Sequence, residues 1–231
     1  MIGLHNVTAF YGNTPIVQSI NVSLKEGGCL AVLGRNGVGK TTLLRAIMGL
    51  TTRTTGEIRL GEARIDDRPT HERALAGLGY VPQGRRILGK LSVRDNIRLG
   101  TFARPDGSNA LPEKCLEMFP YLADNLDRRA GLLSGGQQQQ LAIARALATD
   151  PKVLLLDEPT EGIQPNIVAE IANTLIRLNR EFGISLVLTE QHVAMAKRIA
   201  TEFIVMDTGR VVEKGPIEGL SKEVLEQHLT I

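Results

Sequence analysis

The sequence predicts an α/β fold with an antiparallel β subdomain at its N-terminus and a helical subdomain inserted in the middle. Residues 29–48 join a short apolar run, a glycine-rich turn and a helical segment. Residues 153–156 are continuously apolar, which is typical of a strand covered on both faces of a parallel sheet. Residues 84–148 change to helical character. We therefore expect an α/β core of residues 1–83 and 149–231, with residues 84–148 as the insertion.

Composition limits the classes of function. A chain of 231 residues can form one large domain, or a core with one inserted subdomain. The formal charge of +2 gives no strong electrostatic case for nucleic acid, and 3% aromatic residues without tryptophan make base-stacking platforms a poor interpretation. The longest apolar runs are far shorter than the about 20 residues of a membrane helix, and no signal peptide is evident. Cys29 and Cys115, without a C-x-x-C pattern, predict buried thiols in a reducing, cytosolic compartment.

The N-terminal part predicts strands. Residues 2–33 alternate in a strand-like manner around the turn signals Gly12-Asn13 and Gly27-Gly28. A short strand is expected at 56–61, a short helix at 71–76, and a strand at 78–81. The apolar side chains expected in the core of this part are Leu4, Val7, Ile16, Val17, Ile20 and Val22.

Helix signals dominate the middle of the chain. Ser92 is a candidate N-cap, and Pro112 suits the first turn of a helix that runs to Phe119. The polar stretch 104–110 predicts a loop. Ser134 is expected to cap a long helix that continues through Leu147.

After residue 148 the α/β pattern returns. Apolar residues between Ile167 and Leu178 repeat at helical spacing, and Gly183 is a suitable C-cap for that helix. Residues 186–188 predict a further central strand, and residues 203–212 predict a hairpin. Ser221 is expected to begin a final short helix.

A phosphate-binding loop follows the first buried strand. Residues 34–41 match the pattern G-x-x-x-x-G-K-[ST] between a strand and a helix. The backbone N–H groups and the helix dipole attract phosphate there, Lys40 is expected to reach the β- and γ-phosphates, and the Thr41 hydroxyl is expected to bind Mg²⁺. The alternative is a chance match, which the flanking strand and helix disfavour. The expected nucleotide-binding residues are Gly34, Arg35, Asn36, Gly37, Val38, Gly39, Lys40, Thr41 and Thr42.

Two acidic residues follow the buried strand 153–156. A carboxylate at the C-terminal end of a parallel strand lies beside the loops that follow the neighbouring strands. Asp157 is therefore expected to hold Mg²⁺ through water, and Glu158 to polarise the attacking water. The alternative is a solvated acidic turn, and the phosphate-binding loop favours the functional interpretation.

A second anion site is indicated by Leu133-Ser134-Gly135-Gly136-Gln137, where two glycines and a capping serine begin a helix. One triphosphate does not need two such sites from the same subunit. The motif therefore suggests a dimer in which ATP lies between two chains. An ordinary Ser-Gly-Gly turn is the alternative.

Taken in order, the stretches GRNGVGKTT, YVPQ, LSGGQ and VLLLDEPT resemble those of ATP-binding cassette (ABC) transporter ATPases, over essentially the whole chain. The resemblance implies a P-loop NTPase (RecA-like) core. The stretches VPQGRRIL, LSGGQQQQLAIARAL and VLLLDEPTEGIQPNIV are similar to the ATPases of branched-chain amino acid and urea importers. QQQQLAIARAL and EGIQP most resemble the second ATPase subunit of urea importers.

The resemblance implies further roles for matching positions. Tyr11 matches the aromatic residue that stacks on adenine, with a core tyrosine as the alternative. Gln83 matches a glutamine that touches Mg²⁺ and links the active site to the helical subdomain. The signature residues Ser134, Gly135, Gly136 and Gln137 match those that clasp the γ-phosphate bound to the opposite subunit.

Two positions depart from the family pattern. Gln164 stands where the family usually has an aspartate, in the loop that crosses the dimer. The position of the family's switch histidine falls on Gln191, with His192 one place later, and either residue could act as the γ-phosphate sensor. Consecutive residues at a strand end point in opposite directions, so only one of the two can face the nucleotide. The resemblance to the family favours Gln191.

The resemblance implies an ATPase that uses ATP and Mg²⁺ to drive import, most similar to those for urea, with branched-chain amino acids as the alternative cargo. Expected partners are permease subunits near residues 83–91 and the insertion, a second ATPase subunit in a homo- or heterodimer, and indirectly a solute-binding protein. The expected location is the cytoplasmic face of the inner membrane. A soluble ABC ATPase without a transport role is a weaker alternative, because the chain has one cassette and no heptad repeat. Glu158 disfavours a module that binds ATP without hydrolysing it.

Overall fold

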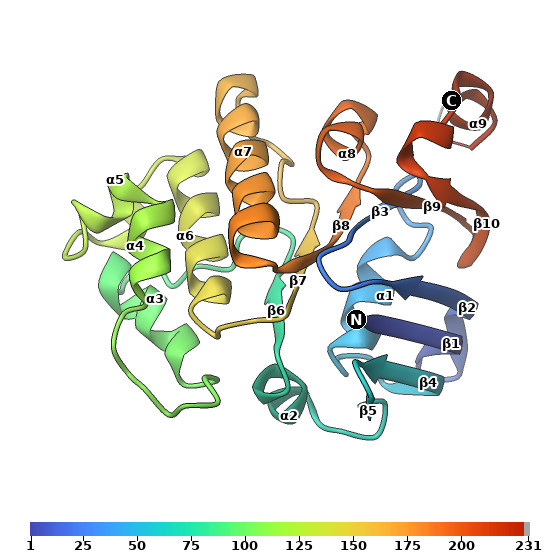
Figure 1. The fold of residues 1–231 in the computed structure, drawn as a ribbon, viewed down its shortest axis with the longest axis horizontal. Helices are drawn as coiled ribbons and strands as arrows, with labels where there is room; N and C mark the ends of the chain where they lie inside the picture. The colour runs from blue at the N-terminus through green and yellow to red at the C-terminus, as the bar shows by residue number, and fades with distance from the viewer. Residues whose placement is uncertain (229–231) are drawn as a thin grey trace.

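The computed structural model describes residues 1–228, which form two β-sheets and a group of helices (Figure 1). The smaller sheet is antiparallel, with the strand order β2-β1-β4-β5. Its strands are β1 (Ile2–Tyr11), β2 (Thr14–Leu24), β4 (Arg53–Leu60) and β5 (Ala63–Arg64). The predicted antiparallel subdomain is confirmed.

The larger sheet has the order β10-β9-β3-β8-β7-β6, and every pair in it is parallel except β9 with β10. The strands are β3 (Cys29–Leu33), β6 (Leu78–Val81), β7 (Val153–Asp157), β8 (Ser185–Glu190), β9 (Glu202–Asp207) and β10 (Arg210–Pro216). All residues of β3, β7 and β8 are buried, as expected for strands covered on both faces.

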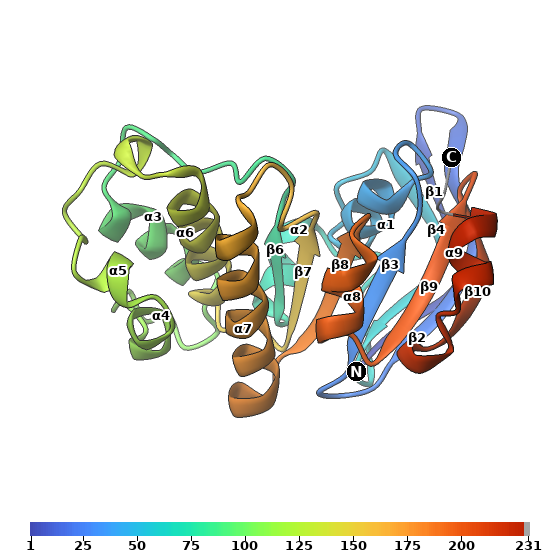
Figure 2. The same cartoon turned by 90° about the horizontal axis from the view of Figure 1, so that it is seen from above.

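Alternate residues of β3 face two different hydrophobic clusters, because side chains of a strand alternate between the two faces of its sheet. Leu30 and Val32 belong to the cluster that contains helix α1 (Lys40–Ile47) and the inner face of the antiparallel sheet. Ala31 and Leu33 belong to the cluster on the other face. Helix α1 thus lies between the two sheets, as Figure 2 shows.

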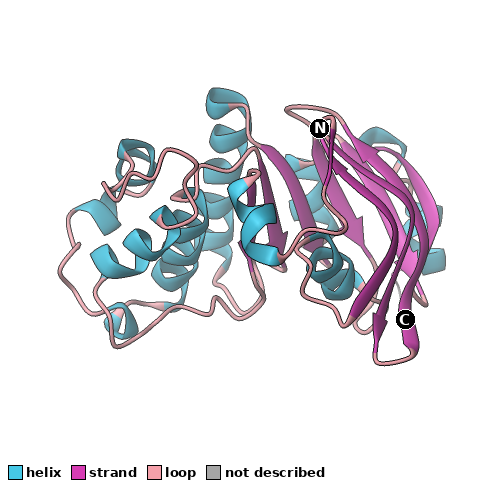
Figure 3. Ribbon diagram, turned by 90° about the horizontal axis from the view of Figure 1, so that it is seen from below, coloured by secondary structure: helices cyan, strands magenta, loops and turns pink. Residues whose placement is uncertain are grey.

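Helices cover the other face of the parallel sheet. They include α6 (Gly135–Leu147), α7 (Pro165–Phe182) and α8 (Val193–Ile199). The shorter elements of the predicted insertion, α3 (Val93–Thr101), α4 (Glu113–Met118), α5 (Pro120–Ala123) and η1 (Ala130–Leu132), gather at the end of the molecule away from the antiparallel sheet (Figure 3). Their buried side chains join the same cluster as β7 and β8. The proposed boundaries at residues 83/84 and 148/149 stay a prediction.

The remaining elements are α2 (Thr70–Leu75), η2 (Ile217–Gly219) and α9 (Lys222–His228). The expected strand 78–81, the hairpin 203–212 and the helix end at Gly183 are confirmed. Ser92 and Ser134 both cap helices through their side chains. Cys29 and Cys115 are free and buried, and burial raises the pKa of each thiol to about 12.

Some expectations need correction. Ile16 and Val22 are half-buried rather than buried, because each packs against the core and also lines a cavity. The strand expected at 56–61 begins three residues earlier, at Arg53, because β4 pairs with β1 as far as Phe10. Pro112 is the N-cap of α4 rather than a residue of its first turn.

The carboxyl ends of β3, β7 and β8 meet at one edge of the sheet, since these strands are parallel neighbours or near neighbours. The loops that follow them therefore converge, and this convergence positions the site described below. Within residues 1–228, no helix is both long and apolar enough to cross a membrane.

Candidate functional site

The loop between β3 and α1 leaves the start of α1 open to an anion. Its N-cap, Gly39, has φ 108° and offers no side-chain acceptor to the first N–H groups of the helix. Gly34 has φ 153°, and a Cβ there would lie 2.6 Å from the carbonyl oxygen of Met206. Any other residue at position 34 would thus collide with the end of β9.

A cavity of about 310 Å³ opens over this loop. Its lining joins the phosphate loop to the ends of β6 and β7, and the lining residues are Ile16, Asn36, Gly37, Gly39, Lys40, Thr41, Thr42, Gln83 and Glu158. Among the described residues, the signature residues 134–137 do not line it. The cavity therefore brings Lys40, Thr41, Gln83 and Glu158 of one chain together, while Asp157 lines a neighbouring cavity that shares Thr41 and Gln83.

Lys40 and Glu158 form a buried ion pair, with 3.2 Å between Lys40 Nζ and Glu158 Oε1. Their side chains are 3% and 7% exposed. The ammonium group also donates to the carbonyl oxygens of Gly34, at 2.8 Å, and Arg35, at 3.1 Å. Lys40 is thus held by the loop itself at the place where a phosphate would bind.

Asp157 is buried at the end of β7 and accepts three hydrogen bonds. Thr189 Oγ1 donates at 2.8 Å, Thr41 Oγ1 at 3.0 Å and the Tyr80 hydroxyl at 3.3 Å. Burial raises the pKa of Asp157, and the nearby Glu158 carboxylate adds to this rise, while the hydroxyl donors oppose it. The carboxylate is therefore oriented by three hydroxyl groups from three different elements.

The sequence interpretation missed Thr189 and Tyr80 as partners of Asp157. Thr189 also accepts the backbone N–H of Glu158 at 2.9 Å, so it positions both acidic residues. A polar residue at the end of a buried apolar strand was the available signal for Thr189. Tyr80 gave no comparable signal, because its alignment with Asp157 depends on the pairing of β6 with β7.

Glu158 follows β7 directly and has φ 46°, a conformation that is uncommon for residues other than glycine. Gln83 Nε2 donates to its Oε2 at 3.2 Å, and Gln191 Nε2 donates to its Oε1 at 3.3 Å. Strained backbone of this kind concentrates at functional sites, where surrounding contacts hold it. Here Lys40, Gln83 and Gln191 fix the carboxylate from three sides.

Gln191 and His192 have different surroundings in the structure. Gln191 lies at the site, where its Nε2 also donates to Asn36 Oδ1 at 2.5 Å. His192 is the N-cap residue of α8 and makes no side-chain capping bond. The expected direction of Gln191 toward the phosphate loop thus agrees with the geometry, and its sensor role stays a prediction.

Gln83 bridges two acidic residues, since its Nε2 also donates to Glu161 Oε2 at 2.9 Å. Glu161 was not a candidate in the sequence. Gln164 is exposed and is the N-cap residue of α7 without a side-chain capping bond. The Gln164 side chain is not among the described residues that line the phosphate-loop cavity of its own chain.

Tyr11 ends β1 with 37% of its surface exposed, so it is not a core tyrosine. The Arg45 guanidinium lies 5.7 Å from the centre of its ring. An exposed ring beside the phosphate-loop helix is available for stacking, while its contact with adenine stays a prediction.

The signature residues begin α6 with a complete capping box. Gln137 N donates to Ser134 Oγ at 3.3 Å, and Ser134 N donates to Gln137 Oε1 at 2.9 Å. Ser134 is exposed, but Gly136 is buried, and a Cβ there would lie 2.5 Å from Ile167 of α7. Arg85 lies against Gly135, where a Cβ would be 3.0 Å from its guanidinium.

Comparisons with known proteins agree with this geometry. The ABC transporter family model matches residues 17–161. The high-affinity branched-chain amino acid transport ATP-binding protein BraG of Pseudomonas aeruginosa is 36% identical over 213 residues, which cover 92% of this chain and 91% of BraG. The probable branched-chain amino acid transport ATP-binding protein LivF of Archaeoglobus fulgidus is 32% identical over 98% of this chain and 94% of LivF.

A solved structure shows the same fold. The ATP-binding cassette MJ0796, a dimer in a post-hydrolysis state bound to ADP and Pi, superposes with a TM-score of 0.82. It is 28% identical and covers 95% of this chain and 100% of its own. The phosphate loop, the acidic strand end and the capped signature helix thus occur in one nucleotide-binding P-loop fold, and the chain belongs to the ABC transporter family as an ATPase.

Proposed function

We propose that this ABC ATPase is the energy-supplying subunit of an importer for small solutes, with branched-chain amino acids as the cargo. The observation that supports ATP hydrolysis is the buried contact of Lys40 with Glu158 at the open start of α1. The cargo rests on BraG and LivF, two relatives named for branched-chain amino acid transport.

Binding of ATP would exchange the partners of Lys40. The phosphates offer a stronger counter-ion than the three oxygens that now surround the ammonium group. Glu158 would then be released from Lys40, and its carboxylate could accept a proton from the attacking water. Gln191 and Gln83 would keep that carboxylate in place through their amide groups.

The residues present fit Mg²⁺, which prefers oxygen ligands and is held in nucleotide sites by few protein groups plus phosphates. Thr41 Oγ1 and Asp157 Oδ1 lie 3.0 Å apart, and both residues line one cavity together with Gln83. We assign these three residues to the metal. When bound, Mg²⁺ would neutralise charge on the phosphates.

The signature turn supports a dimer as the working form, because it lies outside the cavity of its own chain. Ser134, Gly135, Gly136 and Gln137 would complete the site of a second ATPase subunit. The dimeric MJ0796 structure, bound to ADP and Pi, is consistent with this arrangement for a related cassette. The partner could be a second copy or a related chain.

Exposed apolar side chains mark the surface proposed for permease subunits. Phe102 is 70% and Leu132 is 66% exposed, and both belong to the insertion. Leu88 and Leu91 add apolar surface directly after the Gln83 loop. Docking here would hold the chain at the cytoplasmic face of the membrane and connect the permease to Gln83. A solute-binding protein would act through the permease.

Urea is the second candidate cargo. It is favoured by residues 137–147 and 161–165, whose sequence resembles the urea importer ATPase. Both cargoes would be chosen by other chains of the transporter.

Uptake of labelled solutes distinguishes these proposals. Cells in which the gene carries Glu158→Gln should lose uptake of labelled leucine and retain uptake of labelled urea. If the variant cells lose only urea uptake, urea is the cargo, and the proposal of branched-chain amino acids is wrong. Unchanged uptake of both solutes, with the variant protein present at normal levels, would overturn the importer proposal.

A further inference from the structure

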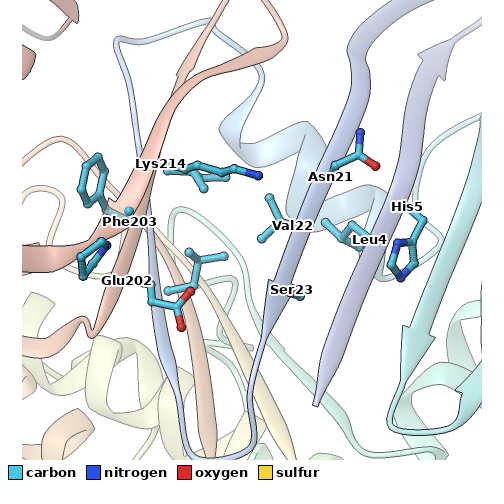
Figure 4. A pocket seen from close by; sticks show the side chains of 12 residues that line it. Leu4, His5, Asn21, Val22, Ser23, Glu202, Phe203 and Lys214 are labelled. Carbon is cyan, nitrogen blue, oxygen red and sulfur yellow. The ribbon is translucent and has the colours of Figure 1, made fainter. Parts of the chain in front are cut away.

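A second cavity lies between the two sheets, away from the phosphate loop. Its volume is about 650 Å³, within the range of small-molecule sites. Figure 4 shows it between β9 and β10 on one side and β1 and β2 on the other. Its lining includes Leu4, Val22, Leu30, Glu202, Ile204 and Lys214.

Four aliphatic side chains line the inner part of this cavity, and Phe203 and the polar residues His5, Asn21 and Ser23 also belong to its lining. Leu4 pairs with Val22 across β1 and β2, and their side chains share the face of the small sheet that turns toward the large one. Leu30 and Ile204 supply the opposite wall from β3 and β9. A small void lined by aliphatic side chains only lies behind these four residues. The cavity therefore has room for a branched apolar group.

Two opposite charges stand at the opening. Lys214 pairs with Ile204 in the sheet, and Glu202 is two residues before Ile204, so the two charged residues are diagonal neighbours on one face. The backbones of such diagonal neighbours are about 7–8 Å apart, within reach of long side chains. Figure 4 shows Lys214 extending across the opening toward β2, with the Glu202 carboxylate at its lower end. In residues 1–228, no ion pair or hydrogen bond joins either side-chain charge to another group.

We propose that this cavity binds an α-amino acid with an aliphatic side chain. Lys214 would receive the α-carboxylate and Glu202 the α-ammonium group, because a zwitterion carries both charges close together. The aliphatic residues would receive the side chain. A ligand with only one of the two charges would lose its contact with Lys214 or Glu202, and a ligand without the side chain would lose its contact with the aliphatic residues.

The position of the cavity gives the ligand a connection to the nucleotide site. The β9–β10 hairpin carries Glu202 and Lys214, and its turn donates from Gly209 N to Val38 O of the phosphate loop at 2.9 Å. A ligand that holds the hairpin would thus alter the phosphate loop. The interpretation of this coupling as feedback by accumulated cargo rests on the proposed function.

Calorimetric titration of the nucleotide-free protein to millimolar ligand concentration tests the binding. L-Leucine should bind at least about tenfold more tightly than isoamylamine, which lacks the carboxylate, isocaproate, which lacks the amine, or glycine. Equal affinity for leucine and these three probes, or absence of leucine binding, would overturn the proposal.

Variants assign the charges. In Lys214→Met, leucine should no longer bind more tightly than isoamylamine. In Glu202→Gln, leucine should no longer bind more tightly than isocaproate. Glu213→Gln is the matched control, because Glu213 is the exposed neighbour of Lys214 on β10 and does not line the cavity. Unchanged selectivity in both rim variants, or an equal loss in the control, would show that leucine binds elsewhere.

ATPase assays separate this inference from the proposed function. Saturating leucine should change the KM for ATP at least about twofold in the wild type and not in Lys214→Met. If the protein hydrolyses ATP but does not bind leucine, only the leucine-site proposal is contradicted. If it binds leucine but does not hydrolyse ATP, only the proposed function is contradicted. Leucine binding with an unchanged KM overturns the coupling to the phosphate loop.

Discussion

The starts of α1 and α6 are two helix N-termini in opposite states. At α1, Gly39 provides no capping side chain, and the buried Lys40 and Glu158 face each other over an open cavity. At α6, Ser134 and Gln137 satisfy each other in a capping box at the surface. The first end leaves its N–H groups for a ligand, while the second already satisfies two of its own.

This difference shows how one chain can contribute to two ATP sites, with its α1 end in its own site and its α6 end in the site of a second subunit. The α1 end concentrates the opposite buried charges of Lys40 and Glu158, whose mutual contact a bound anion and metal would replace. The α6 end is a stable surface feature that a ligand on another subunit could meet without refolding. Substitutions near the start of α1 should therefore change ATP binding and hydrolysis in the same chain. Substitutions at the start of α6 should change the association with a second subunit.

The largest effect is expected for Glu158→Gln. The amide keeps the size of the side chain but cannot accept the proton of the attacking water, so ATPase turnover should fall by about 10²–10⁴-fold. Nucleotide binding should persist, because the Lys40 ammonium group would remain. Steady-state ATPase rates and a calorimetric ATP titration measure the two properties.

Glu161→Gln is the matched control for this variant. Glu161 contacts the same Gln83 amide but is exposed and does not line the cavity. Its ATPase rate should stay within a few fold of the wild type. Similar rates for the Glu158 and Glu161 variants would assign the base to another group.

Ser134→Arg should disrupt the complementary half. A long side chain at this exposed position would block approach of a second subunit, and ATPase activity should fall by about 10²-fold, as for loss of a donor to the reacting group. ATP binding by the single chain should not change, since Ser134 does not line its cavity. Light scattering with ATP and a binding titration provide the two readouts.

Ser92→Ala controls for the loss of a helix cap, because Ser92 caps α3 in the same way that Ser134 caps α6. It should lower stability and leave ATP-dependent dimerisation intact. Weaker ATP binding by single chains of the Ser134 variant would contradict the cross-subunit role. Gly136 is a poorer position for such a variant, because a side chain there would collide with Ile167.

Lys40→Ala should weaken ATP binding by about 10–100-fold, since hydrogen bonds from a charged group contribute about 1.5–3 kcal/mol each. The substitution also leaves Glu158 buried without its cation, which adds repulsion toward the phosphates. Calorimetry measures the affinity, and Lys90→Ala, at an exposed lysine, is the control. An unchanged ATP affinity would refute the assignment of Lys40.

Gln191→Ala should lower the ATPase rate by about tenfold, because it removes one donor that holds Glu158. His192→Ala should change the rate less than about twofold, since His192 makes no capping bond at α8. The reverse order of effects would assign the sensor to His192.

The two helix starts also show what the sequence could predict. The phosphate loop, Asp157 and Ser134 lie in contiguous motifs, and local pattern suffices for a strand, a turn or a cap. Contacts such as Tyr80 with Asp157 and Gln83 with Glu161 depend on which strands become neighbours. The exposure of Tyr11 and the charges at the opening of the second cavity likewise depend on tertiary structure, because the cavity is lined by strands of both sheets.

The smallest effect concerns stability, and it should have opposite signs at the cap of α6 and at Asp157, which accepts a hydrogen bond from Thr41 of α1. Ser134→Ala removes a cap and should lower the free energy of unfolding by about 0.5–2 kcal/mol. Asp157→Asn should raise it in the nucleotide-free protein, because burial disfavours the ionised carboxylate and raises its pKa. The amide can still accept hydrogen bonds from Thr41 and Thr189, while Mg²⁺-dependent hydrolysis should be lost.

The pH dependence gives the stabilisation by Asp157→Asn a testable sign. Between the unfolded pKa of about 3.9 and the raised folded pKa, the native wild type binds more protons than the unfolded chain. Its free energy of unfolding therefore falls as pH rises through this window, whereas the amide introduced by the substitution does not titrate. Urea denaturation should show a larger gain from Asp157→Asn at neutral pH than near pH 4. A gain that is equal at both values, or a loss at neutral pH, would mean that the hydroxyl donors outweigh burial at this carboxylate.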